Sequence, residues 1–203
     1  MRTMPPTRNT PPPTGRQRRA DAERSIARIL DASVDALAND PDASMAEIAR
    51  QAGVVRATVY VHFPTREALI EAVTDRAISE ATEVIAAAEP ERGDAAEALR
   101  RVVTGAWRTL GRYHALVAIN TELPPAELHR RHQPVIAALV PLIERGQRAG
   151  TFRPDVPAAW HLSMLLALIH AASAEVDAGR VLAAQIESAL LATVLGAVSA
   201  QPD

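Results

Sequence analysis

The sequence predicts an all-α protein, in which a small N-terminal helical module precedes a larger helical bundle. From Asp21 nearly to the end, apolar residues recur at the i, i+3, i+4 spacing of amphipathic helices. No apolar run bounded by turn residues has the form of a β-strand. Of the 203 residues, 48% are hydrophobic, which is enough to bury a sizeable core.

The first twenty residues differ from the rest of the chain. They contain five prolines among Thr and Asn and carry no acidic residue. This composition cannot bury enough surface to fold, so residues 1–20 are predicted to form a disordered arm. The net charge of the chain is −2. The excess of basic over acidic residues lies in this arm, which carries Arg2, Arg8, Arg16, Arg18 and Arg19.

The module after the arm is predicted to consist of a long helix, two short helices and a further long one. The first helix places Ile29, Val34 and Leu37 on one face and ends before Pro41. Ser44 and Glu47 have the spacing of a capping box, in which each satisfies a free amide of the other. The helices are expected at 21–39, 44–52, 56–62 and 65–88, the last capped by Thr65.

Two of these helices are joined by a tight turn. Gly53 supplies the left-handed conformation that this turn needs, and the small Ala49 lets the next helix cross close above its predecessor. Four apolar residues are expected to lock the crossing from inside: Ile48, Val54, Val59 and Phe63. This arrangement is typical of a tri-helical helix-turn-helix DNA-binding domain.

Here the sequence resembles a known family. The stretch SMAEIARQAGVVRATVYVHFPTREALIEAV, from Ser44 to Val73, is similar to the signature of the TetR family of transcriptional regulators. The resemblance implies a DNA-binding domain at 21–69 and a helical domain at 70–203 that dimerises and binds an effector. It also implies that the helix at 56–62 is the recognition helix.

By this resemblance, Tyr60, His62 and Arg66 contact DNA phosphates. Arg56 is the candidate for a bidentate contact with guanine. The full set of expected DNA-binding residues is Ser44, Arg56, Ala57, Thr58, Tyr60, Val61, His62, Thr65 and Arg66. Two interpretations of the arginine-rich arm stay open: it enters the adjacent minor groove, or it is a solubilising tail.

The C-terminal part is predicted to form a helical bundle. Helices are expected at 94–118, 125–149, 157–178 and 181–199, the second either continuous or broken at Pro134. The last two repeat apolar residues at helical spacing and are expected to pair with the same helices of a second subunit. The alternative is that these residues belong only to the core of one chain.

An effector pocket is expected among the middle helices, because a pocket combines apolar walls with a few placed polar groups. The candidates are Trp107, Tyr113, His114, Asn120, Glu122, Trp160, Met164 and His170. His129 and His132 have a spacing that two metal ligands on a helix can have, but a solvated surface beside Arg130 and Arg131 is the preferred interpretation. No metal and no cofactor are predicted.

These observations predict a cytoplasmic, homodimeric repressor that binds double-stranded DNA at a palindromic operator and is released by a small-molecule effector. The alternative is a helix-turn-helix regulator without an effector. A helical enzyme is a further alternative, but no phosphate loop, nucleophile motif or metal cluster supports it. No apolar run approaches the roughly 20 residues needed to cross a bilayer, so no membrane partner is expected.

Overall fold

The computed structural model describes residues 15–113, 116, 119 and 125–200, which form helices and no β-strand. The all-α prediction is confirmed. The N-terminal helices are α1 (Gly15–Asn39), α2 (Met45–Gln51), α3 (Arg56–His62) and α4 (Arg66–Ala87). The following elements are α5 (Ala95–Leu110), the short 3₁₀ helix η1 (Gly111–Tyr113), α7 (Pro125–Arg148), α8 (Ala158–Asp177) and α9 (Ala183–Val198).

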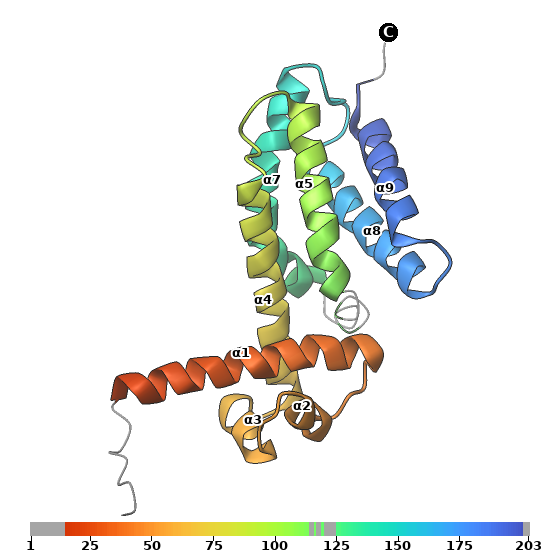
Figure 1. Ribbon diagram of the computed structural model, residues 1–203. Coiled ribbons are helices and arrows are strands. Elements are labelled where there is room, and N and C mark those ends of the chain that lie inside the picture. The colour runs from red at the N-terminus through yellow and green to blue at the C-terminus, as the bar shows by residue number, and fades with distance from the viewer. Residues whose placement is uncertain (1–14, 114–115, 117–118, 120–124, 201–203) are drawn as a thin grey trace, which may run out of the picture.

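Helix α4 connects the two parts of the molecule. Figure 1 shows α1 lying across one end of α4, beside the short helices α2 and α3, while the rest of α4 rises into the bundle of α5, α7, α8 and α9. One apolar core lies at the α1–α3 end and includes Leu69, Val73 and Ala77 of α4. A second core fills the bundle and includes Ala81 and Ile85 of the same helix.

Two predicted boundaries differ from the structure. Helix α1 begins at Gly15, directly after the proline-rich segment, rather than at Asp21. Residues 16–20 are Arg, Gln and Ala, which are good helix formers, so they extend the helix and do not belong to a disordered arm. Residues 1–14 lie outside the described part of the chain. The predicted domain boundary between residues 69 and 70 falls inside α4.

Helix α7 is continuous, although a break at Pro134 was one of the two expectations. It contains Pro134 and Pro141. Both prolines are exposed, so the carbonyl groups that lose an amide partner there can face water. The missing hydrogen bonds therefore fall on the solvent side of the helix, and α7 continues through them.

The connection from α7 to α8 is anchored by Phe152, which is completely buried. A Cβ atom added at Gly146 would lie 2.0 Å from the Phe152 ring, so only glycine fits at this point of α7. After the turn, the amide of Arg153 donates to the carbonyl of Val198 at 2.9 Å. These contacts hold the start of α8 against α7 and the end of α9.

Helix α8 is more apolar than the sequence reading anticipated. Its segment Ala158–Val176 is 19 residues long and, within the described part of the chain, is the one helix long and apolar enough to cross a bilayer. In the structure α8 packs in the bundle against α5, α7 and α9. Three of its polar residues, His161, Ser163 and His170, interrupt the apolar sequence.

Candidate functional site

The turn between α2 and α3 has the predicted geometry. Gly53 has a φ of 64°, and the amide of Val54 donates to the carbonyl of Ala49 at 3.0 Å. Ala49, Val59 and Phe63 are buried beneath the crossing. The apolar contacts therefore set how α3 is held against α2, as the sequence predicted.

The outer face of α3 is exposed and carries few polar groups. Val61 is 77% exposed, Val55 is 71% exposed and Tyr60 is 38% exposed. Arg56 donates a hydrogen bond to the Tyr60 hydroxyl at 3.1 Å, and its guanidinium carbon lies 5.3 Å from the centre of the Tyr60 ring. Arg56 and Tyr60 therefore form a paired unit on the surface of α3, with several Arg56 donors left over.

The other residues of α3 that were expected to contact DNA differ in their exposure. Ala57 is exposed, whereas Thr58 and His62 are half-buried. The His62 ring lies beside Phe63, with 6.4 Å between ring centres. Val55 precedes α3 and provides no side-chain cap, because a valine has no hydrogen-bond acceptor.

The flanking helices begin at the predicted caps. Ser44 accepts a hydrogen bond from the amide of Glu47 at 3.2 Å, and Thr65 accepts one from the amide of Ala68 at 3.1 Å. The reciprocal half of the expected capping box is absent from this described segment, since the Glu47 carboxylate accepts from Arg50 at 2.8 Å instead.

Arg66, which was expected to contact phosphate, is also engaged within the chain. Its guanidinium donates to the carbonyl of Pro41, in the turn between α1 and α2. This contact ties the start of α4 to that turn. An arginine has five N–H donors, so the bond does not use up its capacity.

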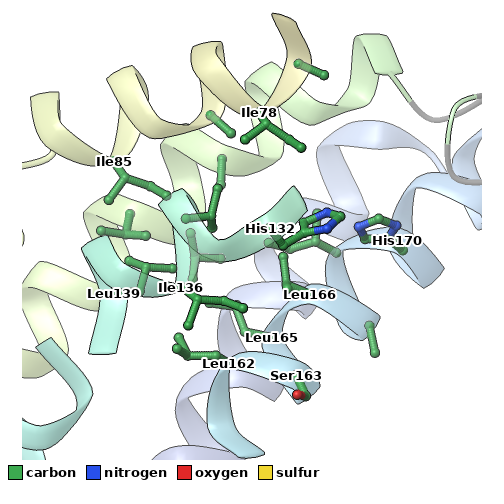
Figure 2. Close-up of a pocket in the computed structure, with 18 of the residues that line it drawn as sticks. Ile78, Ile85, His132, Ile136, Leu139, Leu162, Ser163, Leu165, Leu166 and His170 are labelled. Carbon is green, nitrogen blue, oxygen red and sulfur yellow. The ribbon is translucent and has the colours of Figure 1, made fainter. Parts of the chain in front are cut away.

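A cavity of about 460 Å³ lies inside the bundle, and we call it the central cavity. This volume falls within the range of small-molecule sites. Figure 2 shows part of its lining, with His132 and His170 at one end and aliphatic side chains such as Ile85 and Leu139 farther along. Its walls come from α4, α5, α7 and α8, with Tyr113 of η1 and Leu116.

Two of the predicted effector residues, Tyr113 and His170, line this cavity. Three others do not: Trp107 is buried beside a separate hollow next to α9, Met164 packs against the bundle core, and Trp160 is 62% exposed. These three aromatic or polarisable residues were chosen by residue type, and their helix faces point elsewhere. The remaining candidates, His114, Asn120 and Glu122, lie outside the described residues.

The sequence reading missed three polar residues of the lining: Thr74, His132 and Ser163. His132 was assigned to a solvated surface, and that assignment is wrong. Its ring lies beside His170 of another helix (Figure 2). The sequence offers one weak signal for His132. It lies one turn before the apolar residues Val135 and Ile136, which line the same cavity. Among the described residues, no group of three potential ligands forms a metal site.

Burial shifts the pKa values of Tyr113 and His170 in the cavity lining. Burial and the nearby Glu80 carboxylate raise the pKa of Tyr113 to about 12. Burial also lowers the pKa of His170, and the neighbouring His132 adds to this effect. The Tyr113 hydroxyl is therefore protonated at neutral pH, and the uncharged form of His170 is favoured.

Ion pairs connect α1 with α4 close to this cavity. Arg76 of α4 contacts the Asp31 carboxylate of α1 at 2.6 Å and the Glu80 carboxylate, one turn farther along α4, at 2.9 Å. Arg112 of η1 lies 4.0 Å from Glu80 and 5.7 Å from the centre of the Tyr113 ring. A continuous set of polar contacts therefore runs from α1 to a residue that lines the central cavity.

Comparison with known proteins agrees with this architecture. Residues 29–73 match the family model described as "Bacterial regulatory proteins, tetR family". The chain is 31% identical to the HTH-type transcriptional repressor LfrR of Mycolicibacterium smegmatis over 160 residues, which covers 73% of this chain and 77% of LfrR. It is 29% identical to the HTH-type transcriptional regulator NfxB of Pseudomonas aeruginosa, over 70% of this chain and 78% of NfxB.

A solved structure is also similar. The crystal structure of the TetR-like regulator LfrR from Mycobacterium smegmatis in complex with proflavine superposes with a TM-score of 0.73 at 28% identity. The match covers 88% of this chain and 98% of that one. The similarity therefore extends over both the helix-turn-helix and the bundle that contains the central cavity.

The depressed pKa of His170 predicts how stability depends on pH. Because its pKa in the folded chain is below the usual value of about 6.5, the unfolded chain binds more protons as the pH falls through that value. The free energy of unfolding should therefore decrease on acidification, and His170→Gln should reduce the decrease. Urea unfolding at about pH 7.5 and about pH 5.5 measures the difference; equal decreases in parent and variant would contradict the prediction.

Proposed function

Because this chain belongs to the TetR family of bacterial regulatory proteins, we propose that it is a cytoplasmic, homodimeric repressor that leaves a palindromic operator when a small molecule binds. The observation that carries the proposal is the central cavity, which lies in the same chain as an exposed helix-turn-helix. The similarity to LfrR, whose structure was solved with proflavine, supports a small-molecule effector.

In this proposal, α3 enters the major groove. Arg56 reads a guanine through a bidentate contact, worth roughly 1–3 kcal/mol of discrimination. Its bond to the Tyr60 hydroxyl holds the two side chains together on the exposed face. Val61 and Ala57 are exposed and apolar, which suits contact with thymine methyl groups.

The remaining predicted contacts are assigned to the DNA backbone. Tyr60 and His62 are proposed to meet phosphates, and Arg66 uses the donors that its bond to Pro41 leaves over. Ser44 and Thr65 begin the helices on either side of α3. Thr58 is half-buried, so it is proposed to contribute at the edge of the interface.

A second copy of the chain is proposed to pack on α8 and α9. Trp160 on α8 and Leu182, which directly precedes α9, are large apolar residues that are 62% and 69% exposed. Small exposed residues follow them at helical spacing, including Ala167 and Ala171 on α8 and Ala189 on α9. Small residues allow two helices to approach closely, and the two-fold pairing places two copies of α3 on one operator.

Ligand control requires one structural element that contacts both the cavity and the helix-turn-helix, and α4 is that element. The Asp31–Arg76–Glu80 ion pairs attach α1 to α4 at the level of Tyr113. We propose that a ligand in the central cavity shifts this attachment and with it the separation of the two α3 helices. Binding to DNA then weakens because the ligand and DNA favour different separations.

The proposal predicts the outcome of selecting DNA from a random duplex pool with the purified protein. The enriched sequences should form a palindrome whose half-sites are about 34–36 Å apart, since both α3 helices must reach one face of the duplex. Small molecules, with proflavine as the first, are then tested for release of the selected duplex. Enrichment without release by any compound would favour the regulator without an effector; no enrichment would contradict the DNA-binding proposal.

Substitutions on α3 should distinguish recognition of the bases from contact with the DNA backbone. Arg56→Ala should weaken binding to the selected duplex by roughly tenfold to a hundredfold and affect random DNA much less. Tyr60→Phe should weaken binding to both duplexes by a similar factor, because phosphates carry no sequence information. Titrations with labelled duplex measure both effects. A loss of the same size on both duplexes for Arg56→Ala would refute the role given to Arg56.

A substitution at Arg76 tests the connection between the two sites. Arg76→Met keeps the length and packing of the side chain but removes both ion pairs. The factor by which an effector lowers DNA affinity should shrink about threefold or more, while the affinity of the free protein for that effector changes less. Arg130→Met is the matched control, since the ion pair described for Arg130 is with Glu127 of its own helix. If the effector lowers DNA affinity by the same factor in both variants, the ion pairs of Arg76 do not connect the two sites.

A further inference from the structure

A second hollow lies apart from the central cavity, and we call it the α9 hollow. It has a volume of about 360 Å³, which is within the range of small-molecule sites. Its walls come from the last turns of α5 and α8 and from the first turns of α9. Figure 1 shows these segments at the end of the bundle that is nearer to α1.

The α9 hollow shares two helices with the central cavity, but no described residue lines both spaces. On α5, Val103 and Ala106 line the central cavity, whereas Trp107 lines the α9 hollow. On α8, His170 lines the cavity and Ser173 lines the hollow. The two spaces are therefore separate, although α5 and α8 border both.

The Ser173 hydroxyl is an exception among the buried polar groups. Four polar residues of the described chain are buried, and the other three each have a hydrogen bond to a backbone carbonyl: they are Ser33, Thr74 and His161. Ser173 is only 5% exposed, yet no hydrogen bond among the described residues involves its side chain. An unpaired hydroxyl in so confined a place is unfavourable, so a ligand that bonds to it would be bound favourably.

The indole N–H of Trp107 is a second unpaired group. Trp107 is 7% exposed, and its N–H, which can only donate, has no hydrogen-bond partner among the described residues. In that part of the chain, the unpaired side-chain atoms that are sealed from solvent belong to Tyr113 and His161 alone. The polar atoms of Trp107 and Ser173 therefore border open space, and the α9 hollow is a space that both side chains line.

The charged residues of the α9 hollow neutralise each other. Arg108 of α5 and Glu187 of α9 form an ion pair at 3.1 Å. The rest of the described lining is apolar and consists of Val176, Ala183 and Ala184. A ligand with a net charge would lose its hydration without meeting an unpaired counter-charge, so the hollow favours a neutral molecule.

We propose that the α9 hollow is a second small-molecule site, which takes a small neutral molecule with an apolar body and a carbonyl group. The Trp107 N–H and the Ser173 hydroxyl donate to the carbonyl oxygen, and Val176 and Ala184 contact the apolar body. The proposal goes beyond the proposed function, in which only the central cavity binds a ligand. Because α5 leads directly into η1, which contacts α1, this second site adjoins the connection to the helix-turn-helix.

Three probes of nearly the same size and shape test the ligand class: benzamide, benzoate and benzamidine, which are neutral, anionic and cationic near neutral pH. The chain has only two tryptophans, so Trp160→Phe identifies the indole N–H resonance of Trp107 in the NMR spectrum of the full chain. Benzamide should shift that resonance saturably and bind at least about tenfold more tightly than either charged probe. No saturable shift, or equal or tighter binding of a charged probe, would overturn the proposal.

A matched pair of serine variants tests the assigned hydroxyl. Ser173→Ala should lower the affinity for benzamide by roughly threefold to tenfold, the effect of losing one neutral hydrogen bond. Ser79→Ala makes the same chemical change at an exposed position of α4 outside both spaces, and its affinity should equal that of the parent. Unchanged benzamide affinity in Ser173→Ala would show that the probe binds elsewhere and would overturn the proposal.

Thermal unfolding of the ligand-free variants provides an independent measurement. The melting temperature of Ser173→Ala should equal or exceed that of the parent, because the substitution removes no hydrogen bond and alanine favours the helix. A lower melting temperature would show that the Ser173 hydroxyl is already paired, and the proposal would be wrong. Benzamide binding is measured without DNA, so its failure would leave the repressor proposal standing, and failure of the duplex selection would leave this site standing.

Discussion

Helix α4 belongs to both hydrophobic cores, and both candidate sites depend on this shared helix. Leu69 and Val73 are completely buried in the core beneath α1–α3. Ile85, farther along the same helix, is buried in the bundle and lines the central cavity. Because a packed helix moves largely as a unit, the position of the α3 module and the shape of the cavity are not independent.

The polar contacts where the two cores meet are few, and their placement matters more than their strength. Asp31 of α1 is 54% exposed, and ion pairs with such an exposed partner add little to overall stability. They nevertheless hold α1 at one level of α4, next to Tyr113. A ligand in the central cavity, which Tyr113 lines, would act beside these contacts, which is the physical basis of the proposed release.

The helix-turn-helix could be predicted in detail because its information is local. The Gly53 turn, the Ser44 and Thr65 caps and the burial of Val59 and Phe63 each follow from residues within a few positions of one another. The start of α1 was predicted less well. The proline-rich composition before Gly15 obscured the helix-forming residues that follow it.

The effector site was predicted poorly for a different reason. Trp107, Met164 and Trp160 were selected by residue type, but the structure turns them away from the cavity. His132, by contrast, was assigned to the surface and faces His170. A helical pattern shows which residues share a face, but not which neighbouring helix that face meets.

The sequence by itself determined the helices, their caps, the turn at Gly53 and the resemblance to the TetR family, because each rests on the spacing of residues close together along the chain. Only the tertiary structure decided that Tyr113, His132 and His170, from three separate elements, surround one cavity. Their meeting depends on how α4, α5, α7 and α8 pack together, and such packing follows from side-chain shape over long sequence separations.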